Sequence, residues 1–461
     1  MSDKESGMSQ GNDNLGIVRE KELLRALQLC FGTDCVYYSP KTGSAKTPKE
    51  LCDIIVLALP YAIVIQLKWL KSTAEDFVEG EESAVKQERL LRRMHKAAEQ
   101  YKELSSALSH DAIITLPRVW SANGNGTFQL PLERIKKIVP IVIVDFQDLN
   151  YLDPERRYTD IPPVLTDVPT QIKGWGLVHS FLLADFFRVI DQLFTVGDLL
   201  LWLCERERFF TERPKMLLGY NELTLFSLYL VNNPLWRKIV EGAYNGVWID
   251  DNDCFERVLR EKETAFQKRR DMFHRKNVVD ELIMRMANVA DCEVYVQKEV
   301  SPMILDYLEY SGRIKCWPSM IKHDVARKLI EHLSNFQPTG RPLPILGSYG
   351  FFDYRPVSET VYYFGVAEFN EENAEIYCCE LFIRALSYIQ QHGMKGEVSE
   401  LFILLTRKDR PSVCCKVCPV TDADYQYAIS EEQLKQTRFS FSTDEFRLSE
   451  WDMVNSKRDD K

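Results

Sequence analysis

The sequence lacks three features that would assign it to a broad class at once: an excess of basic residues, a long apolar run and a glycine-rich phosphate loop. Its net charge is −10, so any nucleic-acid site must be a local basic patch and not a basic surface overall. The longest apolar run, around Ile54–Ile65, contains Pro60 and is too short to span a bilayer. The segment Gly347–Gly350 lacks the lysine and helix that complete a Walker loop.

No secretory signal is expected either, because residues 1–14 are polar and predict a disordered tail. The 12 cysteines are scattered in apolar contexts, which favours a reducing, cytoplasmic setting over a disulfide scaffold. The pair Cys415-x-x-Cys418 has zinc-ligand spacing, but Val413–Val420 also has the composition of a strand. We therefore expect a cytoplasmic protein without a membrane segment.

Two apolar runs of strand type, at 54–57 and 62–65, carry polar residues at their ends. Both runs are rich in Val and Ile, and the break at Ala58–Tyr61 predicts a turn, so the runs are expected to form a hairpin. Alternation places Gln66 and Lys68 on one face of the second strand, and hairpin pairing brings Asp53 beside them. Three polar groups are therefore expected to meet at one end of an apolar hairpin.

These side chains suit phosphodiester hydrolysis. A Mg²⁺ ion, or Mn²⁺, prefers oxygen ligands, which a carboxylate and an amide oxygen supply in part. Such a metal polarises a phosphoryl oxygen and lowers the pKa of a bound water, while an ammonium stabilises the developing charge. We expect Asp53 and Gln66 to bind the metal and Lys68 to be catalytic. A buried hairpin whose polar ends merely reach solvent is the structural alternative.

Asp53 followed by Gln66-x-Lys68 resembles the short motif of the PD-(D/E)XK, or restriction-endonuclease-like, nuclease superfamily. The resemblance implies an α/β fold with a mixed sheet flanked by helices. Two positions depart from the family pattern: Gln66 stands where Asp or Glu is usual, and Cys52 stands where Pro is usual. Because Gln66 removes a negative charge from the expected metal site, metal affinity should be weaker and catalysis can be lost.

Residues 17–31 show helical apolar spacing, with Glu20 on the face that also carries Leu23 and Leu27. In the nucleases that this chain resembles, the first core helix often contributes a Glu to the metal site. The resemblance therefore nominates Glu20 as a catalytic and metal-binding residue, with Glu22 as the alternative acid. An ordinary solvated glutamate is the alternative, and it is the better interpretation for Glu22, which lies farther round the helix.

Residues 82–108 predict a long helix with an apolar stripe and a basic face. Lys and Arg side chains that contact the phosphate backbone supply most of the nonspecific affinity for nucleic acids. On this face we expect four phosphate-binding residues: Arg89, Arg92, Arg93 and Lys96. A merely solvated charged face is an equal alternative.

Strand-type runs at 111–116 and 138–144 are expected to complete the sheet of this domain, and 35–40 to add an edge strand. After this domain, prolines between 154 and 169 predict a linker. Helical patterns follow from 175 to 231, with Thr195 as a helix cap. Two of their segments, GDLLLWLCERERFF and GYNELTLFSLYL, resemble parts of bacterial proteins that carry a nuclease-like N-terminal domain.

The length of the chain predicts more than one hydrophobic core. In the C-terminal third, strands are expected at 291–296, 360–369 and 401–406, with a helix at 373–392. We expect five segments: a disordered tail at 1–14, a PD-(D/E)XK nuclease-like domain at 15–150, a linker and helical region at 151–280, a C-terminal α/β domain at 281–443 and a polar tail at 444–461.

The expected function is hydrolysis of phosphodiester bonds in nucleic acid, DNA in the first place, by a Mg²⁺-dependent endonuclease. Related domain mixtures imply a role in defence against foreign DNA, and the C-terminal region is expected to bind a protein partner. A second class stays open. It is a catalytically inactive interaction or regulatory protein that keeps the nuclease fold, with Gln66 as the trace of lost activity.

Overall fold

The structure is a computed structural model of the whole chain, and it is mixed α/β. It describes residues 7–42, 49–70, 81–108, 112–117, 126–146, 171–212, 217–218, 222–231, 247–248, 254–273, 302–319, 345–349, 360–366, 374–391, 398–406 and 413–430, with a few residues between 279 and 286, 322 and 326, and 393 and 396. The chain divides into two compact units, an N-terminal unit of residues 1–272 and a C-terminal unit that begins at residue 273.

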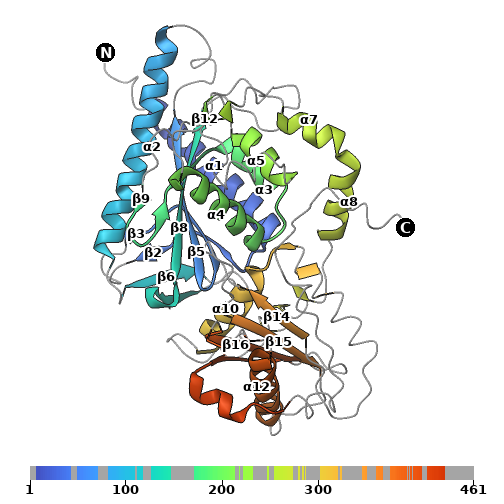
Figure 1. Cartoon of the computed structure of the whole chain (residues 1–461). Helices are drawn as coiled ribbons and strands as arrows, with labels where there is room; N and C mark the ends of the chain where they lie inside the picture. Colours follow the sequence, from blue (N-terminus) through green and yellow to red (C-terminus); the bar gives the residue numbers. More distant parts are fainter. Residues whose placement is uncertain are drawn as a thin grey trace. The chain divides into compact units, whose positions relative to one another are not determined.

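A five-stranded mixed sheet forms the centre of the N-terminal unit (Figure 1). In spatial order its strands are β1 (Val36–Tyr38), β4 (Ile54–Ala58), β5 (Tyr61–Leu70), β8 (Lys137–Phe146) and β11 (His179–Leu182). The first three strands are antiparallel neighbours, whereas β5, β8 and β11 run parallel. The sheet therefore changes direction at β5, the strand that carries Gln66 and Lys68.

The predicted hairpin is confirmed. β4 and β5 pair from Ala58↔Tyr61 to Ile54↔Ile65, with a two-residue turn at Leu59 and Pro60. All residues of β4 are buried, as is the segment Ala62–Ile65 of β5. Strands buried on both faces have near-continuous apolar sequences, which is why these runs are rich in Val and Ile. The predicted edge strand is also confirmed as β1.

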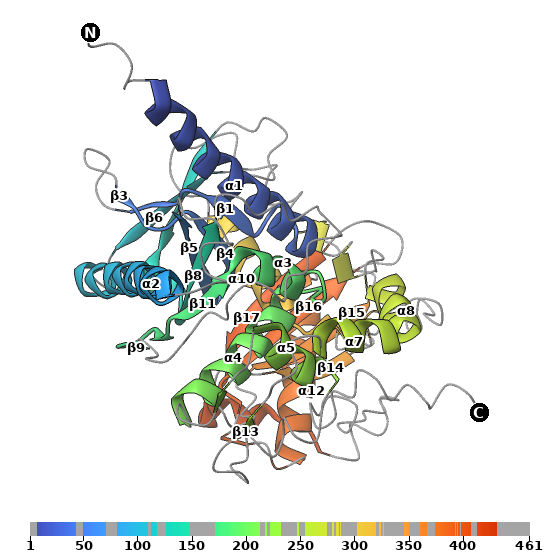
Figure 2. The same cartoon turned by 90° about the horizontal axis from the view of Figure 1, so that it is seen from above.

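Helices cover both faces of this sheet. Figure 2 shows α2 (Glu81–Ala107) on one side of the strands, and α1 (Gly7–Phe31) and α3 (Leu183–Ile190) on the other. α2 is the crossover between the parallel strands β5 and β8, as such a connection requires. The hydroxyl of its buried Tyr101 shares its single hydrogen between the carbonyl oxygens of Val64 (3.1 Å) and Ile141 (3.0 Å), one on each strand.

α1 begins at Gly7, well before the start that the apolar spacing predicts at Ile17. Part of the segment predicted as a disordered tail is therefore helical, while residues 1–6 lie outside the described residues. The polar sequence before Leu15 has no apolar period. A helix can still extend through such a segment, because propagation adds one hydrogen bond for each residue fixed.

One predicted strand belongs to a different sheet. The run at 111–116 forms β6 (Ile113–Pro117), which lies in a four-stranded antiparallel sheet and not in the central one. The other strands of this sheet are β3 (Lys49–Glu50), β2 (Lys41–Thr42) and β7 (Thr127–Pro131). Alternating burial along β6 and β7 is typical of strands with one solvated face, unlike the continuously buried β8.

The central sheet continues past the boundary predicted at residue 150. β11 pairs in parallel with β8, from His179↔Ile141 to Leu182↔Val144. The expected helical region therefore shares a compact unit with the nuclease-like segment. The strand has four residues and is followed directly by α3, so the apolar pattern of the sequence predicts one helix over both elements. The predicted linker at 151–170 lies outside the described residues.

The remaining elements of the N-terminal unit are mostly helical. They are β9 (Gln171–Ile172), β10 (Gly176–Leu177), α4 (Val196–Glu212), β12 (Leu217–Leu218), α5 (Glu222–Leu230), β13 (Val247–Trp248), α7 (Cys254–Glu261) and α8 (Glu263–Phe273). The predicted cap at Thr195 is confirmed, because its Oγ1 accepts a hydrogen bond from the backbone N–H of Asp198 at 3.1 Å. Within the described part of the chain, no helix is both long and apolar enough to cross a membrane.

The C-terminal unit is an α/β arrangement, as expected. Its sheet has the order β14 (Ile345–Tyr349), β15 (Thr360–Val366), β16 (Glu400–Thr406) and β17 (Val413–Pro419), and its described helices include α10 (Pro302–Lys315) and α12 (Ala374–Gln391). β15 and β16 are parallel and joined through α12, just as β5 and β8 are joined through α2. The strand predicted at 291–296 and the tail at 444–461 lie outside the described residues.

Alternation along β16 explains how this second sheet is covered. Leu401 and Ile403 belong to the apolar cluster that α12 completes with Leu381. Phe402, between them, meets Tyr310 of α10 with ring centroids 5.6 Å apart. Arg313 of α10 also binds Glu400 through three hydrogen bonds of 2.8–3.0 Å. The two helices therefore pack on opposite faces of β16.

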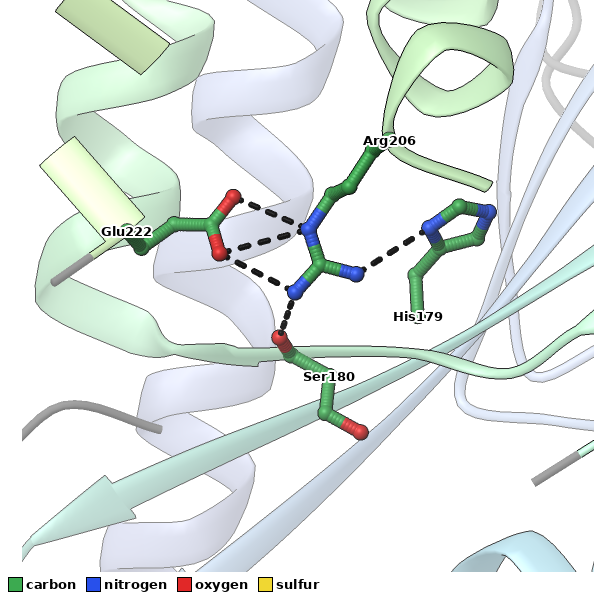
Figure 3. A network of polar contacts seen from close by, with 4 residues as sticks. All are labelled: His179, Ser180, Arg206 and Glu222. Atoms are coloured by element: carbon green, nitrogen blue, oxygen red, sulfur yellow. Dashed lines mark hydrogen bonds and ion pairs between the residues drawn. The ribbon is translucent and has the colours of Figure 1, made fainter. Parts of the chain in front are cut away.

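A buried ionic network ties α4 and α5 to the central sheet of the N-terminal unit (Figure 3). Arg206 of α4 is fully buried and donates hydrogen bonds to both carboxylate oxygens of Glu222, at 3.0–3.2 Å, and to the carbonyl oxygen of Ser180 at 2.9 Å. Its guanidinium lies over the rings of Phe181 and Phe210, with its central carbon 4.5 and 4.7 Å from their centroids. This geometry satisfies a charge that would otherwise be costly to bury.

The Arg206 guanidinium also determines the protonation state of the His179 imidazole. Its Nη1 donates to Nδ1 of the imidazole at 3.2 Å, so Nδ1 is unprotonated and the ring is neutral. Burial, reinforced by the charges of Arg206 and Lys137, holds the pKa of His179 well below its usual range. The network therefore contains one full ion pair and one neutral histidine.

Removing the carboxylate from this network should strongly destabilise the N-terminal unit. Glu222→Ala leaves the Arg206 charge buried without its partner, so we expect a loss of about 3–5 kcal/mol of unfolding free energy. The matched control is Asp191→Ala, which breaks the pair with Arg270, where the Asp191 side chain is 62% exposed and the loss should be below about 1 kcal/mol. Urea denaturation of the full chain measures both. Equal losses would show that the buried pair is not a major source of stability.

Asp185 should make stability depend on pH in an unusual direction. Burial, with a further contribution from Glu222, raises its pKa to about 8. The folded state therefore keeps a proton that the unfolded chain releases from about pH 4 upward, and stability falls as the pH rises to about 8. Asp185→Asn should remove this loss, which amounts to about 4 kcal/mol between pH 5 and pH 8. Urea denaturation across this range, with Asp191→Asn as control, tests it; parallel curves for wild type and Asp185→Asn would contradict it.

Candidate functional site

Asp53 is fixed at the polar end of the β4–β5 hairpin. Because Ile54 pairs with Ile65, Asp53 lies opposite Gln66. Its backbone N–H donates to the carbonyl oxygen of Ile65 at 3.1 Å, and its Oδ2 accepts a hydrogen bond of 2.6 Å from the N–H of Leu67. The structure therefore brings Asp53 to the segment of β5 where the sequence predicts it.

Lys68 lies two residues beyond Gln66 on β5, so both side chains belong to the same face of the strand. Lys68 is half-buried, and burial lowers the pKa of its ammonium. The charge of Asp53 opposes this shift, and the charge of Lys96 on α2 adds to it. The ammonium thus lies within the field of the acid at the start of β4 and of a second cation on α2.

The carboxyl of Asp53 is also perturbed. Burial raises its pKa to about 6, while the hydrogen bond from the Leu67 N–H and the charge of Lys68 act in the opposite direction. The charges of Glu20 and Glu50 raise this pKa further. The carboxyl groups of Asp53, Glu20 and Glu50 and the ammonium of Lys68 therefore lie close enough to interact electrostatically, although they come from different elements.

Glu20 of α1 is the member of this group that lies farthest from Asp53 along the sequence. Its Oε2 accepts a hydrogen bond of 2.6 Å from the hydroxyl of Tyr38 on β1. Glu22, the alternative acid, lies elsewhere: its side chain is 45% exposed and pairs with Arg19 at 2.7 Å. Of the two acids nominated on this helix, the structure places Glu20 and not Glu22 beside Asp53 and Lys68.

Glu50 is a residue that the sequence pattern does not identify. It lies on the two-residue strand β3, and its Oε1 accepts a hydrogen bond of 2.5 Å from the hydroxyl of Ser39. Its charge acts on both Asp53 and Lys68. The segment around it has no apolar period, so the only signal in the sequence is its position three residues before Asp53.

The amide oxygen of Gln66 is the most informative polar atom of the site. This Oε1 is buried and has no hydrogen-bond partner. A buried carbonyl oxygen without a partner is costly unless a ligand or a water satisfies it. An oxygen of this kind beside the carboxylate of Asp53 suits a hard divalent cation, for which Asp53, Gln66 and Glu20 would be the protein ligands.

The acids alone do not make a closed metal site. Among the described residues, no group of three or more His, Cys, Asp or Glu side chains is arranged to hold a metal ion. A cation here would therefore depend on the Gln66 oxygen and on ligands from water or phosphate, as is usual for Mg²⁺.

The residues predicted to bind phosphate are only partly described. Arg92 and Lys96 have exposed side chains on α2, whereas the side chains of Arg89 and Arg93 lie outside the described residues. Lys96 is close enough to lower the pKa of Lys68, so it faces the polar end of β5. It is the member of the predicted phosphate-binding set that the structure relates to the candidate site.

Comparison with known proteins assigns the chain to no family: no family model, curated protein or solved structure matches it.

Introducing an acid at position 66 should reveal whether the site binds a cation. Gln66→Glu adds a carboxylate where the amide oxygen lacks a partner, so Mg²⁺ or Mn²⁺ should raise the melting temperature of this variant more than that of the wild type. Without metal, the added charge should cost about 1–3 kcal/mol of stability.

The control is Gln66→Met, which keeps the length of the side chain and removes its oxygen, and should show a smaller metal effect than the wild type. Thermal unfolding with and without each metal measures all three proteins. If metal did not rescue the melting temperature of Gln66→Glu, Gln66 would not belong to a metal site.

Proposed function

We propose that the chain is a metal-dependent nuclease of the PD-(D/E)XK type that hydrolyses phosphodiester bonds, with DNA as the favoured substrate. The observation that carries the proposal is the placement of Asp53 opposite Gln66, with Lys68 two residues farther along the same strand. Glu20, from the first helix, reaches the same place through its bond to Tyr38. Apart from Gln66, which stands where the family usually has Asp or Glu, these are the residues and elements that the superfamily motif predicts.

The order of the elements also supports the proposal. Leaving aside the strands of the second sheet, the chain passes through a helix (α1), an edge strand (β1), an antiparallel hairpin (β4–β5), a second helix (α2) and a parallel strand (β8). This agrees with a restriction-endonuclease-like mixed sheet flanked by helices. Such a fold is compatible with many activities, so the functional proposal depends on the site.

Each side chain has a distinct role in the proposed reaction. Asp53, Gln66 and Glu20 would hold a divalent cation, which when bound polarises the phosphoryl oxygen and lowers the pKa of a water. Lys68 places a positive charge where negative charge develops on the phosphoryl group. Lys96 and Arg92, on the basic face of α2, would bind phosphates of the substrate backbone and fix its position.

A noncatalytic interaction or regulatory protein with the same fold is the second candidate. It is favoured by Gln66, which replaces the usual acid, and by the lack of a three-residue metal-ligating group among the described His, Cys, Asp and Glu side chains. In that case Lys68 and Lys96 would still offer positive charge to nucleic acid without cleaving it. A protein partner for the C-terminal unit and a setting in defence against foreign DNA are compatible with either candidate.

Cleavage assays on Lys68→Ala distinguish the two candidates. For a nuclease, this substitution should reduce Mg²⁺-dependent cleavage of plasmid DNA by at least about 100-fold, because it removes a charge that acts on the transition state. Circular dichroism should show the same folded structure for variant and wild type, since Lys68 is half-buried at the end of a strand and not part of the core.

The control is Lys262→Ala, an exposed lysine at the junction of α7 and α8, which should cleave at the wild-type rate. Equal cleavage by Lys68→Ala and wild type would remove Lys68 from the reaction. Binding of DNA or RNA by the wild type without any cleavage, over a range of Mg²⁺ and Mn²⁺ concentrations, would favour the noncatalytic candidate.

A further inference from the structure

Two consecutive residues at the end of β1, Tyr38 and Ser39, contact all three acids of the candidate site. The Tyr38 hydroxyl donates to Oε2 of Glu20 at 2.6 Å. The Ser39 hydroxyl donates to Oε1 of Glu50 at 2.5 Å, and the Ser39 backbone N–H donates to the carbonyl oxygen of Asp53 at 2.7 Å. The acids come from α1, β3 and the start of β4, so this dipeptide links three separate elements.

The backbone of Ser39 explains how neighbouring side chains can serve one site. In a regular strand, successive side chains point to opposite faces of the sheet. Ser39 has a φ angle of 48°, in the left-handed region that residues other than glycine rarely adopt. This conformation ends the alternation after Tyr38, so the hydroxyls of both residues reach acids of the same group. Strain of this kind persists when surrounding contacts fix it, and here the hydrogen bonds of Ser39 to Glu50 and Asp53 do so.

The direction of each hydrogen bond is determined by its partners. The ammonium of Lys41 can only donate hydrogen bonds, and its Nζ donates one to the Ser39 hydroxyl oxygen at 2.7 Å. The hydrogen of that hydroxyl is therefore left for Glu50. The Tyr38 hydroxyl likewise donates its hydrogen to Oε2 of Glu20. Both hydroxyls are therefore donors to carboxylate oxygens of the site.

We propose that Tyr38 and Ser39 are positioning residues that hold Glu20 and Glu50 beside Asp53 and Lys68, an inference that rests on the proposed nuclease function. In this arrangement Glu50 gives the site a nearby carboxylate that compensates for the charge missing at Gln66. Groups that orient metal-binding side chains typically change metal affinity or activity about 10–100-fold when they are mutated. The two hydroxyls should therefore affect metal binding even though they are not ligands.

The test compares three single variants of the full chain. Tyr38→Phe removes one hydroxyl. Ser39→Gly removes the other and keeps a residue that adopts the left-handed conformation without strain. Tyr37→Phe is the matched control, because it removes the hydroxyl of the neighbouring tyrosine of β1, which donates a hydrogen bond to the carbonyl oxygen of Asp34 at 2.7 Å. Two measurements are made on each protein: the rise in melting temperature with Mn²⁺, and the Mg²⁺ concentration that gives half-maximal cleavage of DNA.

We expect Tyr38→Phe and Ser39→Gly to need at least about 10-fold more metal than wild type in both measurements, and Tyr37→Phe to need the same as wild type. If wild type cleaves DNA and Lys68→Ala does not, while all three variants match wild type, the positioning role is wrong and the nuclease proposal stands. If Tyr37→Phe is as impaired as Tyr38→Phe, the effect is a general loss of packing and the positioning role is again wrong. If wild type neither cleaves nor responds to Mn²⁺, both proposals fail together.

Discussion

The pairing of β5 with β8 determines how the N-terminal unit is built. The two strands are parallel and in register from Tyr61↔Lys137 to Leu70↔Phe146, and α2 must cross the sheet between them. On its other edge β5 pairs with β4, so its central residues have no access to solvent and are apolar. Polar side chains can occur only where this enclosure ends, and Gln66 and Lys68 stand at that end of the strand.

The C-terminal end of β8 is joined to the first helix by an ion pair. Asp145, at the end of β8, is fully buried and pairs with Arg19, whose Nε lies 3.3 Å from its Oδ2. The next residue of α1, Glu20, binds Tyr38 on β1. Two consecutive residues of one helix therefore bind strands on opposite sides of β5, which keeps the carboxylate of Glu20 at the polar end of that strand.

Two polar systems among the described residues of the N-terminal unit lie in different environments. The network of Arg206, Glu222 and His179 is fully enclosed, and its partners satisfy the ion pair completely. At the candidate site, burial of the Asp53 carboxyl, with further contributions from the charges of Glu20 and Glu50, raises its pKa to about 6. Groups arranged at a cost in stability are typical of functional sites, whereas a satisfied buried pair is typical of a structural one.

Much of the core of this unit could be predicted from sequence because it depends on local patterns. Runs of Val and Ile identify β4, β5 and β8, and Thr195 with Asp198 identifies the start of α4. The rest depends on contacts between distant residues. Nothing local distinguishes β6, which joins the second sheet, from a strand of the first, and the four residues of β11 merge with the helix that follows. The candidate site could be predicted only in part. Asp53, Gln66 and Lys68 follow from alternation along one hairpin. Glu50 does not, since the pairing of β3 with β2 and the left-handed turn at Ser39 bring it to that place.

The parallel pairing of β5 with β8 also has a consequence for biosynthesis. The ribosome delivers β4 and β5 together, and their hairpin can form at once, but the second edge of β5 keeps its N–H and C=O groups unpaired until residue 146 has emerged. During that interval a long apolar strand edge is open to pairing with any other nascent chain. The segment made in between contains α2, β6 and β7. The central sheet can therefore close only after a helix and part of a second sheet have left the ribosome, although the hairpin that carries Gln66 and Lys68 is made first.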